Sequence, residues 1–161
     1  MATSAASHDA ARVALLLGRE PESTFDVVVR DASGEPVVLR NAPLMLNGRP
    51  MPTRYWLIGK EALLHVSRLE AAGGVRAAEA AIPPHEVAAA HARYAAERDA
   101  ALPADHRGPR PSGGVAGTRQ GVKCLHAHYA YHLAGGDDPV GRWVAARLAD
   151  GDAAHLSPAS A

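Results

Sequence analysis

The chain has a single cysteine, Cys124, among its 161 residues, so it cannot close an internal disulfide. Aromatic residues are also scarce: one Phe, two Trp and four Tyr make up 4% of the sequence. Alanine supplies much of the apolar composition. Because alanine is the strongest helix former, we expect a helix-rich core with few large side chains.

No charge of either sign prevails, because seventeen Lys and Arg residues balance seventeen Asp and Glu residues. A chain without net charge exerts no general attraction on nucleic acid or on an anionic membrane. The sequence also lacks a signal-peptide pattern, and no apolar run approaches the ~18 residues of a membrane span. Phosphate-loop, dinucleotide-binding and nucleophile-elbow motifs are absent. We therefore expect a cytoplasmic protein without a specific nucleic-acid or membrane partner.

The first third of the chain carries the strand and turn signals of a small antiparallel sheet. β-Branched residues predict strands at 25–30 and 36–39, joined by a hairpin loop at 31–35. Asn47-Gly48 predicts a second turn, since both residues tolerate positive φ, and a third strand follows at 53–58. A first helix is expected before the sheet, from a cap at Ser7 or Asp9 to Gly18.

Helical patterns dominate the rest of the chain. Helices are predicted at 60–72, 83–102 and 121–133, and a last helix starts with Asp138 as its cap and Pro139 as its first residue. Gly73-Gly74 is expected to end the first of these, and residues 103–120 to form a loop. This order predicts an α+β fold, a small antiparallel β-sheet of about three strands packed against four to five α-helices. We expect a single domain at 8–149, with flexible ends at 1–7 and 150–161.

The predicted helix at 121–133 contains the only cysteine and three of the nine histidines. Within a helix, Cys124 and His128 are one turn apart and share a face, while His126 points away. This pair is the candidate for catalysis, with Cys124 as a thiol nucleophile and His128 as its base. Alternatively, Cys124, His128 and His91 are candidate ligands of a zinc ion. The third interpretation is an inert core cysteine, which is the commonest role of a free cysteine.

The loop before this helix is basic and rich in glycine. It has no acidic residue between His106 and Lys123 but contains four cations, Arg107, Arg110, Arg119 and Lys123. Free N–H groups at a helix start attract anions, and glycines allow a ligand to approach the backbone closely. We therefore predict that a phosphate, a nucleotide or a carboxylate binds there. The helix start, Lys123 and Arg119 are expected to favour the thiolate form of Cys124.

A polar stripe on the predicted helix at 83–102 completes the candidate site. His91, Tyr94 and Arg98 have the spacing of residues on one helical face. We expect this face to lie opposite Cys124 and His128, although such a stripe is also typical of an amphipathic boundary. The candidate ligand-binding residues are His91, Tyr94, Arg98, Arg119, Lys123 and His126.

Short segments between residues 12 and 148 resemble the bacterial domain-of-unknown-function family 501, which is widespread in actinobacteria. The resemblance is carried by Asn47-Gly-Arg-Pro-Met-Pro-Thr53, Tyr55-Trp-Leu57, Ser67-Arg-Leu-Glu70, Ala90-His-Ala-Arg-Tyr94, Asp138-Pro-Val-Gly141 and, most specifically, Val122-Lys-Cys-Leu-His126. It implies a bacterial protein but no particular activity, because the family has none established. Cysteine is common in the family where this chain has Asp31, so a metal site that uses that position is not available here.

Together these patterns predict a non-enzymatic module that binds an anionic small molecule or partner in a pocket lined by Cys, His and Arg side chains. The first alternative is an enzyme or metal-binding protein that uses Cys124, His128 and His91. The second is a structural protein-interaction domain that uses the aromatic surface at Tyr55 and Trp56 or at Trp143. The residue spacing leaves all three classes open.

Overall fold

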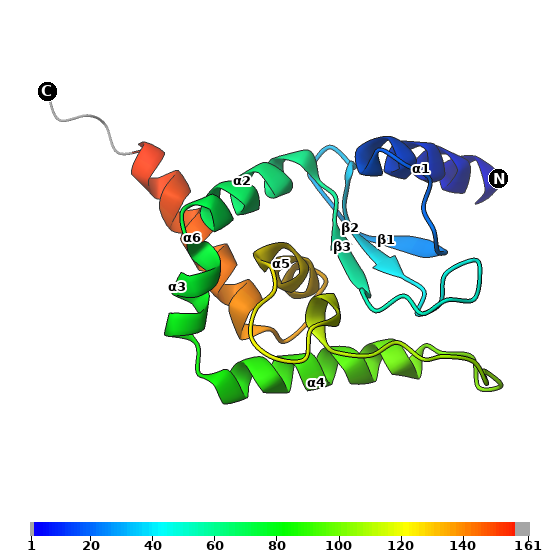
Figure 1. Ribbon diagram of the computed structural model, residues 1–161. Coiled ribbons are helices and arrows are strands. Elements are labelled where there is room, and N and C mark those ends of the chain that lie inside the picture. Colours follow the sequence, from blue (N-terminus) through cyan, green and yellow to red (C-terminus); the bar gives the residue numbers. More distant parts are fainter. Residues whose placement is uncertain (1, 157–161) are drawn as a thin grey trace, which may run out of the picture.

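The computed structural model describes residues 2–156 and has the α+β fold that the sequence predicts (Figure 1). Within these residues, a three-stranded antiparallel sheet lies beside six α-helices and one short 3-10 helix. In chain order the elements are α1 (Ala2–Leu17), β1 (Phe25–Arg30), β2 (Pro36–Asn41), β3 (Tyr55–Leu57), α2 (Lys60–Ala71), α3 (Gly74–Ala81), α4 (Pro84–Ala100), η1 (Val115–Gly117), α5 (Leu125–Leu133) and α6 (Pro139–Leu156).

The sheet has the order β1-β2-β3, so each strand pairs with its neighbour in the sequence. The Asp31 carboxylate accepts the N–H groups of Ser33 and Glu35, and Gly34 has a φ of 88°. These contacts close the β1–β2 hairpin in the predicted loop. Gly48, with a φ of 82°, closes the predicted second turn before β3. Local turn chemistry therefore determines how the strands pair.

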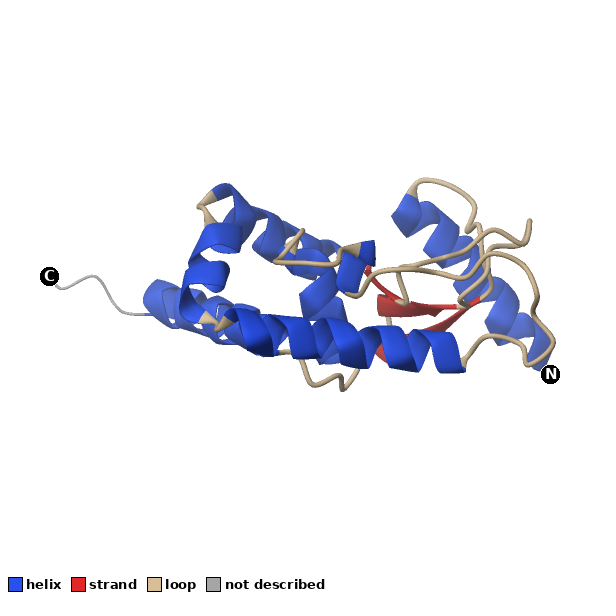
Figure 2. Ribbon diagram, turned by 60° about the horizontal axis from the view of Figure 1, so that its bottom comes forward, coloured by secondary structure: helices blue, strands red, loops and turns tan. Residues whose placement is uncertain are grey.

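The sheet separates two apolar clusters, because neighbouring residues of β2 point to opposite faces. On one face α1 covers the sheet, and Val13 packs with Leu39 and Ile58. On the other face lies a larger cluster that includes Val38 and Leu57 together with residues of all the later helices. Helix α5 is central to this cluster and contacts β3, α2 and α6 (Figure 1). Figure 2 shows the strands between the helix next to the N-terminus, which is α1, and the later helices. The polar side chains of α5 therefore need partners from the protein itself.

Helix α3 was not predicted, and it raises the number of helices above the expected four to five. Gly73 adopts the left-handed conformation, with a φ of 89°, and separates α2 from α3. Gly74 then begins α3 instead of ending the helical region. A glycine with positive φ ends one helix, but it does not prevent the next helix from starting at once.

The first and last helices extend beyond their predicted limits. Helix α1 begins at Ala2, and α6 continues to Leu156. They overlap the segments 1–7 and 150–161 that we expected to be flexible, of which residues 1 and 157–161 lie outside the described part of the chain. Between residues 2 and 156, no helix has both the length and the apolar character that crossing a bilayer requires.

Candidate functional site

Cys124 precedes α5 instead of lying within it. Its backbone is extended, with φ −152° and ψ 152°, and it occupies the N-cap position of the helix, which begins at Leu125, without a side-chain capping hydrogen bond. The prediction of a helix from residue 121 was therefore wrong, and helical spacing does not place Cys124 and His128 on one face. The thiol is half-buried, whereas His128 is buried and bonded to Asp138.

The surroundings of Cys124 disfavour a thiolate. Burial raises the pKa of the thiol, and the nearby carboxylate of Glu70 raises it as well. The N–H group of Ala127 and the charge of Lys123 act in the opposite direction but do not outweigh burial. The helix start and Lys123 thus lower the pKa of the thiol, as expected, but burial outweighs both effects and the net shift of the pKa is upward.

Native Cys124 is expected to react with iodoacetamide more slowly than Cys124 of the unfolded chain at about pH 8, because only the thiolate reacts. Its rate should continue to increase above pH 9.0, the ordinary pKa of the thiol. Mass spectrometry of the carbamidomethylated protein measures the rate across pH, and the chain in guanidinium chloride is the control. A native rate that levels off below neutral pH would show that the thiol is activated after all.

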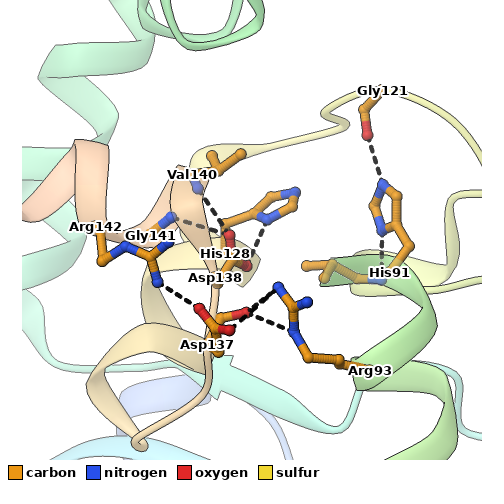
Figure 3. A network of polar contacts seen from close by, with 10 residues as sticks. His91, Arg93, Gly121, His128, Asp137, Asp138, Val140, Gly141 and Arg142 are labelled. Atoms are coloured by element: carbon orange, nitrogen blue, oxygen red, sulfur yellow. Dashed lines mark hydrogen bonds and ion pairs between the residues drawn. The ribbon is translucent and has the colours of Figure 1, made fainter. Parts of the chain in front are cut away.

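His128 forms a buried pair with Asp138, which caps the start of α6 as predicted (Figure 3). One carboxylate oxygen of Asp138 accepts the N–H groups of Val140 and Gly141, and the other lies 2.6 Å from Nδ1 of His128. Because an ionised carboxylate only accepts, Nδ1 carries the hydrogen. Nε2 has no hydrogen-bond partner among the described residues. With 1% of its side chain exposed, His128 stabilises the fold and is closed to a substrate from solvent.

His91 lies on α4 beside this pair, and the ring centroids of His91 and His128 are 5.6 Å apart. Its Nδ1 accepts the N–H of Val115 at 3.0 Å, and its Nε2 donates to the carbonyl oxygen of Gly121 at 2.8 Å (Figure 3). These contacts fix one neutral tautomer, and burial lowers the pKa of His91. Both ring nitrogens are therefore engaged by backbone groups. In the described part of the chain, no three His, Cys, Asp or Glu side chains lie close enough together to hold a metal ion.

Tyr94 and Arg98 continue the stripe along α4, and both are buried. The Tyr94 hydroxyl accepts two backbone N–H groups, those of Arg54 and Tyr55. Arg98 donates to the carbonyl oxygen of Gly113 at 3.0 Å. The stripe thus attaches two irregular segments to α4, the one before β3 and the loop before α5. The side chains of this stripe are polar although they are buried. They satisfy backbone N–H and C=O groups that would otherwise lack hydrogen-bond partners.

The predicted anion site at the start of α5 holds carboxylates of the chain itself. Glu70 of α2 accepts the N–H of Leu125 at 2.7 Å. Glu79 of α3 accepts the N–H of Val122 at 2.9 Å. These side chains satisfy donors that would otherwise attract an external anion.

The remaining predicted ligand-binding residues are Arg119, Lys123 and His126. Arg119 and Lys123 are exposed on the loop. His126 is directed toward α2, where its Nδ1 lies 2.9 Å from Oε1 of Glu70 and its Nε2 lies 3.2 Å from Oγ of Ser67. Sequence reasoning missed this contact, because it joins residues 59 positions apart. Of the six candidates, the three stripe residues thus bond to backbone groups, whereas Arg119 and Lys123 are exposed and His126 contacts α2.

A cleft of about 240 Å³ lies instead beside the start of β1, the end of β2 and the end of α4. Arg40 and Asp26 line it and form an ion pair at 3.0 Å, since the β1–β2 register places them opposite each other. The full lining is Thr24, Phe25, Asp26, Arg40, Ala42, Pro43, Arg54 and Ala101. We call this the arginine cleft.

Arg54 is the arginine of this cleft that has no carboxylate partner among the described residues. Its Nη1 donates to the carbonyl oxygen of Asn41 at 2.7 Å, and its buried Nε has no hydrogen-bond partner in the described structure. No Asp or Glu of the described residues forms an ion pair with it. The pairing of Arg40 on β2 with Tyr55 on β3 brings Arg40 close to Arg54. The sequence does not show the register of two paired strands, so sequence reasoning did not identify this site.

Comparison with known proteins agrees with the resemblance seen in the short segments. The model of a family described as "Protein of unknown function (DUF501)" matches residues 27–146. The chain belongs to the DUF501 family. No curated protein and no solved structure matches it. The DUF501 match begins within β1 and ends within α6, so it includes the buried histidines, the contact between Ser67 and His126, and both arginines of the cleft.

Proposed function

We propose that this protein binds an anionic group, carried by a small molecule or by a partner, in the arginine cleft. The observation that supports the proposal is Arg54, a half-buried guanidinium that no carboxylate of the described residues neutralises. A charge withdrawn from water is stable when it is paired. The guanidinium fork binds a carboxylate or phosphate through two parallel hydrogen bonds. Arg40 adds a second cation, whose partner Asp26 is 68% exposed.

The size of the cleft narrows the class of ligand. Its volume of about 240 Å³ lies below the range of roughly 300–1,000 Å³ that is typical of sites for drug-sized ligands. A phosphate monoester or a small carboxylic acid fits this volume better than a whole nucleotide does. Thr24 and Asp26 supply oxygen acceptors for a hydroxyl or amino group on the same ligand.

The basic loop is the competing location for an anion. Arg119 and Lys123 are exposed there, and exposed cations in water contribute little to specific binding. The N–H groups at the start of α5 are bonded to Glu70 and Glu79. A variant of Arg119 therefore serves as the matched control for a variant of Arg54.

Inorganic phosphate is expected to raise the melting temperature of the wild-type protein beyond the effect of sodium chloride at equal ionic strength. Arg54→Ala should weaken phosphate binding by about 10- to 100-fold, since a hydrogen bond to a charged group contributes about 1.5–3 kcal/mol. Arg119→Ala should retain the wild-type affinity. Calorimetric titration with phosphate, and with acetate as a carboxylate, measures each affinity.

Arg54 also bonds to the backbone of Asn41, so the melting temperature of each variant without ligand is compared first. Arg40→Ala is the second test of the cleft, because it removes a cation that pairs with the exposed Asp26. The proposal fails if the wild type shows no anion-specific shift. It also fails if Arg119→Ala abolishes the shift and both cleft variants retain it.

A further inference from the structure

We infer that Ser67, His126 and Glu70 form an acyl-transfer site that cleaves small carboxylic esters, separate from the arginine cleft. Ser67 and Glu70 lie one turn apart on α2, and His126 lies in the first turn of α5. Oγ of Ser67 is 3.2 Å from Nε2 of His126, and Nδ1 of His126 is 2.9 Å from Oε1 of Glu70. Nucleophile, base and orienting carboxylate thus follow one another in a hydrogen-bonded chain.

Glu70 determines the tautomer of His126. Its Oε1 also accepts the N–H of Leu125 at 2.7 Å, which holds the carboxylate at the start of α5. A carboxylate in this position only accepts, so the imidazole hydrogen is on Nδ1. The lone pair on Nε2 is then directed at the hydroxyl of Ser67. A histidine in this state can accept the serine proton, which is the role of a general base.

The buried pair of His128 and Asp138 is the internal comparison. It has the same contact between Nδ1 and a carboxylate oxygen, at 2.6 Å, but its side chains are 1% and 0% exposed. Its Nε2 has no hydroxyl partner in the described part of the chain. The side chains of His126 and Glu70 are 26% and 25% exposed, and Ser67 is exposed. Of the two pairs, the one between α2 and α5 is therefore open to a substrate from solvent.

The reaction is that of an ester with a good leaving group, such as an aryl acetate, which reaches the exposed Ser67 from solvent. Oγ of Ser67 attacks the carbonyl carbon while its proton passes to Nε2 of His126. The bond between the carbonyl carbon and the leaving oxygen then breaks, and His126 returns the proton to that oxygen. Water attacks the acylated serine in the same manner and releases the acid. Glu70 touches no reacting atom and is a positioning residue.

The test is the hydrolysis of p-nitrophenyl acetate by the full chain in a Cys124→Ser background, so that the thiol does not contribute. Nitrophenol should be released faster than in buffer, and mass spectrometry after an acid quench should find the acetyl group on Ser67. Ser67→Ala and His126→Gln should each lower the rate by about 10²-fold or to the buffer level. Ser112→Ala removes a different exposed serine and should leave the rate unchanged.

The pH profile separates catalysis from a merely structural role. The rate should rise with pH through one ionisation, and that ionisation should be lost in His126→Gln. Glu70→Ala should lower the rate, and Glu70→Asp should restore part of it. Glu70 also accepts an N–H at the start of α5, so the melting temperature of each variant shows how much of the rate loss comes from reduced stability. An unchanged rate in Ser67→Ala, or acetylation of other side chains without acetylation of Ser67, would overturn the inference.

Discussion

Replacing Asp138 with alanine is expected to lower the free energy of unfolding by about 3 kcal/mol or more, because three buried N–H groups lose their acceptor at about 1–3 kcal/mol each. The N–H groups of Val140 and Gly141 lose their acceptor at the start of α6. The Nδ1 hydrogen of His128 is left without a partner in a site where both side chains are at most 1% exposed. Urea denaturation followed by circular dichroism measures the change.

The matched control for this variant is Asp137→Ala. Asp137 is the preceding residue, is 62% exposed and pairs with Arg142 and Arg93 at the surface. Because ion pairs at the surface contribute little to stability, this control should lose far less stability than Asp138→Ala does. Asp138→Asn retains an oxygen for the helix cap and should fall between the two. Equal losses in the two alanine variants would show that the buried pair does not stabilise the fold.

Sequence signals predicted the elements that local chemistry determines. The loop after Asp31, the turn at Gly48 and the helix cap at Asp138 each depend on residues a few positions apart. All three are confirmed. Cys124 was predicted to lie inside the helix, but it precedes the helix. The first residue of a helix is difficult to predict to within a few positions, which explains this error.

The partners of the polar side chains could not be predicted in this way. Helical spacing correctly placed His91 and Tyr94 on one face of α4, but it does not tell which group lies opposite. The groups opposite are backbone atoms of distant segments, such as the N–H of Tyr55, 39 positions from Tyr94. A stripe of donors and acceptors in a sequence therefore indicates burial against backbone as readily as it indicates a ligand.

Glu70 connects the two proposals. Its carboxylate accepts the N–H at the start of α5, where the sequence predicted that an external anion binds. We therefore propose the anion site at Arg54, whose Nε has no hydrogen-bond partner in the described structure. The Glu70 carboxylate also orients His126 toward Ser67. The two sites share no residue, so phosphate affinity and ester hydrolysis can be lost independently. Arg54→Ala should leave hydrolysis unchanged, and Ser67→Ala should leave phosphate affinity unchanged.

Replacing Tyr94 with phenylalanine is expected to lower the free energy of unfolding by about 2–6 kcal/mol, because one buried and one part-buried N–H group lose their acceptor at about 1–3 kcal/mol each. These groups belong to Arg54 and Tyr55, and the Tyr94 side chain is fully buried. The substitution removes one oxygen and leaves the ring packing in place. The predicted loss therefore comes from the hydrogen bonds alone.

Urea denaturation measures this loss, and Tyr129→Phe is its control. Tyr129 is half-buried on α5, and its hydroxyl forms no hydrogen bond with the described residues, so its removal should change stability by less than about 0.5 kcal/mol.

Amide hydrogen exchange gives a second measurement, since the amides of Arg54 and Tyr55 should lose protection in Tyr94→Phe before the rest of the sheet does. Because the Arg54 backbone positions the guanidinium of the arginine cleft, Tyr94→Phe should also weaken phosphate binding. Unchanged protection of both amides would contradict the role of Tyr94 as the anchor of this segment.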